Sequence, residues 1–273
     1  ELVLSQDFGP LTHGVAVLLL FTLLSGALAL PLHVYETFRL EARFGFNRTS
    51  VRTFVLDRVK GLLVLLVLGV PFLYALLALI AHAGEWWWLW AALFVIAFQC
   101  LMMVLAPLVI APLINKFTPQ PDGELKTRLE DLARQCDFAV RGIFLADGSR
   151  RSGHSNAYFT GLGKARRIVL YDTLVQQLGV AELAAVLAHE IGHYKKKHIL
   201  MAVGLSAAVT VAGMYVLSLV LDWHPLYQAF GLAVPNVPKG LIAVSLIAGH
   251  LTFWLMPLGN WLSRRWEYQA DAY

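Results

Sequence analysis

Charged residues are scarce in this sequence. Asp, Glu, Lys and Arg make up 15% of the 273 residues and 58% are hydrophobic, whereas soluble domains contain about 25% charged residues. This composition excludes an ordinary soluble domain and indicates a membrane protein. Cysteine is scarce too: Cys100 lies in an apolar run and Cys136 in a polar segment. No disulfide framework is therefore expected.

Motifs for binding nucleic acid are also lacking, although the sequence pI is about 9.1, so we expect no nucleic acid partner. Five stretches without Asp, Glu, Lys or Arg exceed the ~18 residues that cross a bilayer. They are Leu11–Leu32, Gly61–Gly84, Trp86–Asn115, His198–Leu221 and Gly240–Ser263. The sequence thus predicts five membrane spans, with the lipid bilayer as a partner.

The Lys and Arg residues are distributed unevenly between the connections. Six lie between the first two stretches and thirteen between Lys116 and Lys197, whereas the opposite connections hold only Lys239. Because cytoplasmic loops carry an excess of Lys and Arg, we expect the N-terminus outside and both basic segments in the cytoplasm. The fold predicted is mainly α: a polytopic membrane helical protein with a small α/β cytoplasmic domain.

The one long hydrophilic segment, residues 116–197, is the place to expect that domain. Leu125, Leu129, Leu132 and Cys136 fall on one helical face, residues 142–145, 156–160 and 167–171 resemble strands, and a helix is expected to begin near 172 or 180. We therefore divide the chain into 1–115 (three spans and a basic loop at about 33–60), 116–197 (the cytoplasmic domain), 198–263 (two spans) and 264–273 (the start of a further helix).

The last expected helix of the domain contains His189-Glu190-Ile191-Gly192-His193, an H-E-x-x-H pattern. Histidines four residues apart lie about one helical turn apart on one face, so their imidazoles can bind the same Zn²⁺. Glu190 then lies beside the metal and can reach its water. The alternative is a pair of surface histidines at the end of a cytoplasmic helix.

A catalytic zinc site usually has three protein ligands and one open position. The metzincin extension is excluded, because Lys196 and Ile199 stand where it requires Gly and His. His198 would lie about 140° around a continuous helix from His193, which favours a supporting role over a ligand role. If the helix continues beyond the fifth span, Glu267 and Asp271 share a face; the alternative is a helix start with solvated charges.

Four motifs in order resemble the integral-membrane zinc CAAX prenyl proteases, the type I, a-factor-converting enzymes of the gluzincin class. These motifs are Asn115–Pro119, His154–Gly161, Leu187–His193 and Glu267–Asp271. The resemblance extends from about Pro31 to Tyr273. Members of this family usually have further helices before the position of Glu1 and a cytoplasmic tail after the last motif, so we expect both to be missing from this sequence.

The resemblance implies that residues 116–197 form a zinc-protease domain. It also implies one Zn²⁺ per chain with His189, His193 and Glu267 as its ligands. Glu190 would be the catalytic base, and Asp271 a proton donor or a support for a ligand. It also implies that Asn156, with its neighbours Ala157 and Tyr158, lies on an edge strand that binds the substrate backbone.

The implied function is zinc-dependent hydrolysis of a peptide or protein substrate, possibly prenylated, near its C-terminus and at the cytoplasmic membrane interface. The membrane would be the plasma or inner membrane in a bacterium and the endoplasmic reticulum in a eukaryote. Two alternatives stay open: a quality-control metalloprotease of the heat-shock type, and a binding protein or carrier with a structural zinc. In the last case His198 or His154 could complete a closed four-ligand site.

Overall fold

The computed structural model describes residues 9–160 and 166–273. Within these ranges, five helices are long and apolar enough to cross a membrane. They are Pro10–Glu41, Val51–His82, Gly84–Ile114, His198–Leu221 and Val237–Asp271. Each overlaps one of the five predicted stretches, so the predicted number and positions of the apolar helices are confirmed.

Three of these long helices contain a π-helical turn, which is η1 (Glu36–Glu41), η2 (Leu65–Gly69) or η4 (Ala106–Ile110). The α-helical parts are α1 (Pro10–Tyr35), α2 (Val51–Val64), α3 (Val70–His82), α4 (Trp87–Leu105) and α5 (Ala111–Ile114), and the 3-10 turn η3 (Gly84–Trp86) precedes α4. Pro71 and Pro112 follow η2 and η4. A proline ring meets the carbonyl four residues earlier, and in both helices that carbonyl lies in the wider π turn. The turns therefore accommodate proline within continuous helices.

The chain divides into two compact units. The first comprises Glu1–Pro31, Leu63–Cys100 and Ala202–Trp261, and the second comprises Leu32–Leu62, Leu101–Met201 and Leu262–Tyr273. The first unit holds most of α9 (His198–Leu221), all of α10 (His224–Ala229) and most of α11 (Val237–Asp271). All the predicted site residues belong to the second unit.

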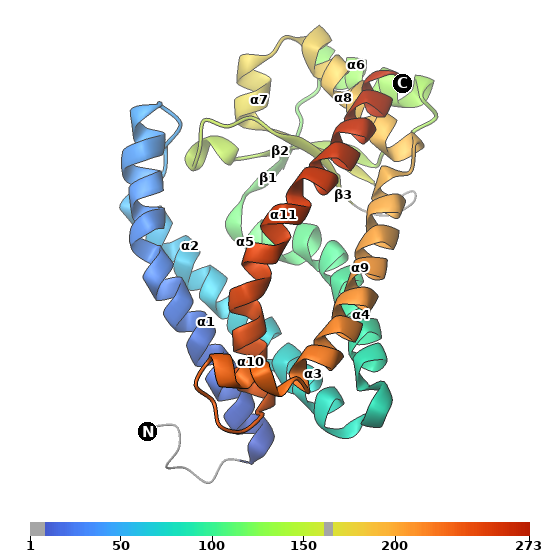
Figure 1. The fold of residues 1–273 in the computed structure, drawn as a ribbon. Coiled ribbons are helices and arrows are strands. Elements are labelled where there is room, and N and C mark those ends of the chain that lie inside the picture. The colour runs from blue at the N-terminus through green and yellow to red at the C-terminus, as the bar shows by residue number, and fades with distance from the viewer. Residues whose placement is uncertain (1–8, 161–165) are drawn as a thin grey trace. The chain divides into compact units, whose positions relative to one another are not determined.

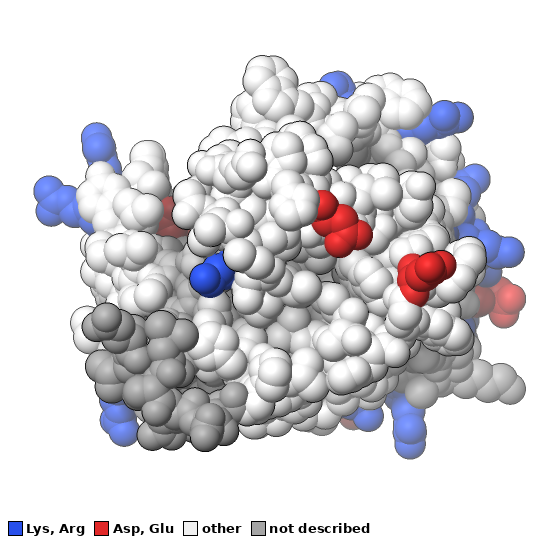
Figure 2. Space-filling model, turned by 60° about the horizontal axis from the view of Figure 1, so that its bottom comes forward, with Lys and Arg blue, Asp and Glu red and all other residues white. Residues whose placement is uncertain are grey.

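The first unit has little interior of its own and many apolar side chains on its surface. Two small clusters are buried, whereas Leu28 and Trp254 are 81% and 76% exposed. The buried residues are Val15, Leu18 and Leu77 in one cluster and Leu226, Tyr227 and Ala243 in the other. Figure 2 shows one face of the molecule, on which uncharged side chains predominate and Lys and Arg concentrate at the rim. Exposed apolar helices of this length are the surfaces that lipid covers.

The second unit contains a four-stranded sheet (Figure 1). Its strands are β1 (Phe117–Pro119), β2 (Gly142–Ala146), β3 (Ala157–Thr160) and β4 (Arg167–Tyr171), in the order β1-β2-β4-β3. β2 and β4 are parallel, and the outer pairs are antiparallel. The three predicted strands are confirmed, β1 was not expected, and the predicted link between β3 and β4 at 161–165 lies outside the described residues. β3 is an edge strand.

Helices α6 (Glu124–Gln135) and α8 (Val180–Lys195) form the core of this unit with one face of the sheet. The core buries Leu129, Phe138, Ile143, Ile168, Leu170, Leu183, Leu187 and Ile191. Leu125, Leu132 and Cys136 pack against it, which confirms the predicted apolar face of α6. Because α8 packs against a rigid sheet, the side chains on its other face are held in place.

The helix expected to begin near residue 172 or 180 is two helices, α7 (Asp172–Gln177) and α8. α8 begins after Gly179, whose backbone N–H donates to Glu182 Oε2 at 2.7 Å. It ends at Lys195, and Lys197 has a φ of 60° before α9 starts at His198. The histidine pair therefore stands in the last turns of a short helix.

Candidate metal centre

Three side chains from two helices bring their ligand atoms together. His189 and His193 lie one turn apart on α8, and their Nε2 atoms are 3.1 Å apart. Glu267 reaches them from α11, with its Oε2 3.2 Å from His189 Nε2 and 3.4 Å from His193 Nε2. Within the described residues, these three form the one group of His, Cys, Asp and Glu spaced to hold a metal ion.

The spacing of these atoms fits zinc. A tetrahedral Zn²⁺ with bonds of about 2.0–2.1 Å holds its ligand atoms about 3.3–3.4 Å apart, and the three separations are 3.1, 3.2 and 3.4 Å. Two imidazole nitrogens and a carboxylate are also a ligand set of catalytic zinc sites with an open position. The residues present therefore fit a zinc ion with three protein ligands.

Glu267 belongs to this group because α11 continues as a helix to Asp271. This continuation was the condition under which Glu267 and Asp271 were predicted to share a helical face. The same helix brings Asp271 to the other nitrogen of His189, where Oδ1 lies 2.7 Å from Nδ1. A carboxylate oxygen can only accept here, so Nδ1–H donates and the lone pair of Nε2 points to the metal position. Asp271 thus selects the tautomer of His189 that a metal needs.

His198 selects the tautomer of His193 in the same way. It is 3% exposed and stacks on the ring of Trp266 at 5.5 Å. Its Nε2 lies 3.0 Å from Gln269 Oε1, and its Nδ1 lies 3.0 Å from His193 Nδ1. Because the Gln269 oxygen accepts from Nε2–H, the Nδ1 of neutral His198 accepts from His193 Nδ1–H. The Nε2 lone pair of His193 is then free for the metal.

His198 contacts His193 and lies outside the metal-spaced group, in agreement with the supporting role expected for it. The predicted position of His198 relative to His193 was wrong. The angle of about 140° assumed one continuous helix, but the chain breaks at Lys196 and Lys197. Because of this break, the side chain of His198 lies against His193 of α8. His154, the other possible extra ligand, instead stacks on Phe46 with ring centroids 4.3 Å apart.

Glu190 lies between the two histidines in sequence and is partly buried. Burial raises the pKa of its carboxyl above the ordinary glutamate value, because the charged form loses solvation. His193 and His189 oppose the rise in pKa, and Glu267 adds to it. A raised pKa makes this carboxylate a better proton acceptor than an exposed one.

The edge strand β3 offers backbone groups for hydrogen bonding. Asn156 O accepts from Tyr171 N at 2.9 Å, and bonded pairs alternate along an antiparallel ladder. Tyr158 and Thr160 therefore face β4 with their backbone groups, whereas Ala157 and Phe159 direct theirs to the open edge. Of the predicted trio, only Ala157 has the right backbone orientation to bind a peptide strand. Phe159 was not among the predicted residues, because alternation along the strand leaves two sets of residues and only the register with β4 decides which set faces the open edge.

Tyr158 has its side chain on the sheet face that does not pack on α8. There it lines a cavity of about 560 Å³ together with Phe144 and Arg167, among others. Burial raises the pKa of its hydroxyl. This side chain is therefore separated from the metal group by the thickness of the sheet.

Comparison with known proteins agrees with a metallopeptidase that spans a membrane. Residues 2–116 match the family described as CAAX prenyl protease N-terminal, five membrane helices. Residues 119–273, more than half of the chain, match Peptidase family M48. The chain belongs to Peptidase family M48, a family of metallopeptidases, and is an integral, multi-pass membrane protein.

Particular relatives are similar along nearly the whole chain. CAAX prenyl protease 1 homolog of Arabidopsis thaliana is 40% identical over 89% of this chain and 58% of its own length. CAAX prenyl protease 1 of Saccharomyces cerevisiae is 39% identical over 93% of this chain and 60% of its own length. The crystal structure of S. mikatae Ste24p matches with a TM-score of 0.90 and 35% identity, over 97% of this chain and 65% of that one. The chain thus spans about three fifths of the length of these relatives.

Proposed function

We propose that this protein is a zinc-dependent endopeptidase that hydrolyses peptide bonds at the cytoplasmic membrane interface and binds one Zn²⁺ per chain. The observation that carries the proposal is the spacing of 3.1–3.4 Å between the ligand atoms of His189, His193 and Glu267. The Nδ1 atoms of both histidines have other partners, which leaves both Nε2 atoms for a metal. Membership of a metallopeptidase family supports it. In this assignment residues 116–197 and 264–273 carry the chemistry, and residues 1–115 and 198–263 hold the spans.

His189, His193 and Glu267 would hold the metal in this mechanism. Zinc bound there would act as a Lewis acid that polarises a peptide carbonyl and makes a neighbouring water more acidic. Glu190 accepts the proton of the attacking water and passes it to the leaving amine. Asp271 orients His189, because its carboxylate is already engaged by Nδ1–H; this contact favours ligand support over proton donation.

The substrate backbone binds by strand addition at β3. The outward N–H and C=O groups of Ala157 and Phe159 would pair with alternate residues of an extended peptide. Such binding depends on the main chain and tolerates many side chains. It therefore suits an enzyme whose specificity comes from the membrane and from the end of the substrate.

The relatives are named as CAAX prenyl proteases, and we extend that substrate class to this protein: prenylated proteins that lose their C-terminal tripeptide. The match of residues 2–116 to the CAAX protease N-terminal family favours this class over the heat-shock type. The excess of Lys and Arg in the two basic segments supports a cytoplasmic active site. That site would face the cytoplasm at the plasma or inner membrane of a bacterium, or at the endoplasmic reticulum of a eukaryote.

The test combines metal analysis of the purified, detergent-solubilised protein with cleavage of a quenched farnesylated CAAX peptide and its unprenylated twin. One zinc per chain and prenyl-dependent cleavage are expected, with chelation abolishing cleavage and zinc restoring it. Cleavage of both peptides at equal rates would remove the prenyl specificity and leave the peptidase. Absence of zinc, or cleavage that a chelator leaves unchanged, would overturn the proposal.

A further inference from the structure

The segment of residues 151–156, which we call the lead-in segment, runs directly into the edge strand β3. It forms one isolated bridge, between Ser152 and Asn47, and no regular strand or helix. A segment without a ladder of its own takes its conformation from the groups that satisfy its backbone. Its partners therefore determine where β3 begins.

Several of those partners lie in the loop between the first two spans. The backbone N–H of Arg48 donates to Arg151 O at 3.1 Å, and the N–H of Gly153 donates to Phe46 O at 2.7 Å. The hydroxyl of Thr49 also donates to Arg151 O, at 2.8 Å. Together with the stack of His154 on Phe46, these contacts hold the lead-in segment along this loop.

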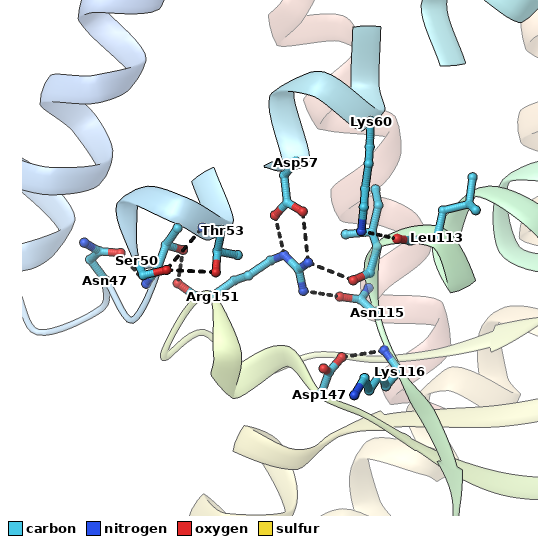
Figure 3. A network of polar contacts seen from close by, with 12 residues as sticks. Asn47, Ser50, Thr53, Asp57, Lys60, Leu113, Asn115, Lys116, Asp147 and Arg151 are labelled. Carbon is cyan, nitrogen blue, oxygen red and sulfur yellow. Dashed lines mark hydrogen bonds and ion pairs between the residues drawn. The ribbon is translucent and has the colours of Figure 1, made fainter. Parts of the chain in front are cut away.

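The Arg151 side chain extends the attachment to α2. Its Nε and Nη2 donate to the two carboxylate oxygens of Asp57 at 2.7 and 3.1 Å. The same guanidinium donates to Asn115 Oδ1 at 3.0 Å and to Ile114 O at 2.7 Å (Figure 3). A planar guanidinium that meets a carboxylate with two parallel bonds has a fixed orientation.

This ion pair is shielded from solvent. The side chains of Arg151 and Asp57 are 18% and 25% exposed, and the hydrogen bond to Asp57 raises the pKa of the guanidinium. Partly buried charges that lose their partner cost more than exposed ones. The Arg151–Asp57 pair is thus a specific contact with one favoured geometry.

The opposite side of the lead-in segment is held by α7. Thr173 Oγ1 donates to His154 O at 2.9 Å, and Gln177 Nε2 donates to Gly153 O at 3.2 Å. The segment is therefore held between α7 of the sheet region and the loop of the first two spans. A change on either side alters the direction in which the chain enters β3.

We propose that the loop between the first two spans, together with the first turns of α2, positions the substrate-binding strand, with Asp57 of α2 and Arg151 as the positioning residues. The proposal rests on the proposed function, because β3 matters here as the strand to which a peptide adds. Neither residue touches the metal group. They act through the placement of Ala157 and Phe159, whose outward backbone groups would pair with the substrate strand, so their loss should weaken substrate binding.

The test uses Asp57→Asn, which keeps the shape of the side chain and removes its charge. The expected result is a rise in KM of about five- to tenfold, a kcat within about twofold, and an unchanged zinc content. Amide hydrogen exchange in the peptide containing β3 should become faster. Asp131→Asn is the matched control, because Asp131 pairs with Arg134 on α6 and makes no contact with the lead-in segment in the described contacts.

Two further variants make the test decisive. Asp57→Glu keeps the charge and should recover most of the wild-type KM. The double variant Asp57→Asn with Arg151→Gln should have a KM no higher than that of the more damaging single variant, because both changes remove the same Arg151–Asp57 ion pair. Wild-type KM and wild-type exchange in Asp57→Asn would overturn the proposal, and so would equal damage from Asp57→Glu. If the wild-type protein cleaves nothing, the proposed function fails, while the exchange measurement still decides the positioning.

Discussion

Gly192 faces the backbone of Ala270 with no room for a side chain between them. A Cβ atom on Gly192 would lie 2.7 Å from the carbonyl oxygen of Ala270 and 3.1 Å from its Cα. Ala270 is 2% exposed and precedes Asp271. The glycine therefore permits the close approach of α11 to α8 that brings Glu267 to the two histidines.

Gly192→Ala should separate the two helices and weaken zinc binding. Alanine favours a helix over glycine by about 1 kcal/mol, so α8 itself should remain, while the backbone of Ala270 must move. We expect the dissociation constant for zinc, measured by competition with a chelator, to rise at least about tenfold. Gly204→Ala is the control, because a Cβ there meets nothing within 4 Å. Equal zinc affinity in both variants would contradict this explanation.

Glu190→Gln should separate metal binding from catalysis. The variant keeps the three ligand atoms and loses the proton acceptor, so zinc content should stay at the wild-type level while kcat falls by about two to four orders of magnitude. Glu267→Ala should lower both zinc content and kcat. Turnover at the wild-type rate in Glu190→Gln would refute the role of Glu190 as the base.

The raised pKa of Glu190 also predicts how stability depends on pH. A carboxyl whose pKa is higher in the folded than in the unfolded state stabilises the fold below its unfolded pKa, and that contribution is lost as pH rises through the folded pKa. Metal-free Glu190→Gln should therefore have a higher Tm than metal-free wild type at about pH 8. The difference should shrink towards about pH 4. A difference independent of pH would contradict the assignment.

Replacing His198 should affect zinc affinity although His198 is not one of the three ligands. His198→Phe keeps a ring to stack on Trp266 and removes the acceptor for His193 Nδ1–H. We expect zinc affinity to fall by about 10- to 100-fold, the usual effect of losing a group that orients a ligand. His154→Phe is the matched control, because His154 stacks on Phe46 away from the metal group. Unchanged zinc affinity in His198→Phe would show that His193 needs no such partner.

Methylation of the substrate backbone tests strand addition at β3. An N-methyl group removes one donor, so methylation should raise KM at alternate residues only, with the period of two of a β-strand. Peptides methylated at successive positions can be compared by their rates of cleavage. Equal effects at all positions would argue against pairing with Ala157 and Phe159.

The sequence predicted those features that depend on local composition or periodicity. The five apolar helices follow from the length of the uncharged stretches, and the strands of the hydrophilic segment and the apolar face of α6 follow from patterns of two or 3.6 residues. The break at Lys197, with its φ of 60°, has no such pattern, and for this reason the position of His198 was predicted wrongly. The need for glycine at position 192 was invisible as well, because it depends on Ala270, which is distant in sequence.

The site residues themselves were found from spacing and from the family resemblance, and their chemical roles stay predictions. The structure brings His189, His193 and Glu267 together and places Asp271 against His189. Gln269 and Phe159 could not be chosen beforehand, because their importance depends on how α11 faces α8 and on the register of β3 with β4.

The continuous course of α11 has a consequence for biosynthesis. Two of the proposed ligands precede α9 and the third follows the last apolar stretch, so a ribosome must complete both spans before Glu267 emerges. A nascent or prematurely terminated chain therefore contains the histidine pair without its carboxylate partner. Assembly of the proposed metal site therefore depends on synthesis of the last helix, so a partly made chain lacks the complete set of ligand atoms.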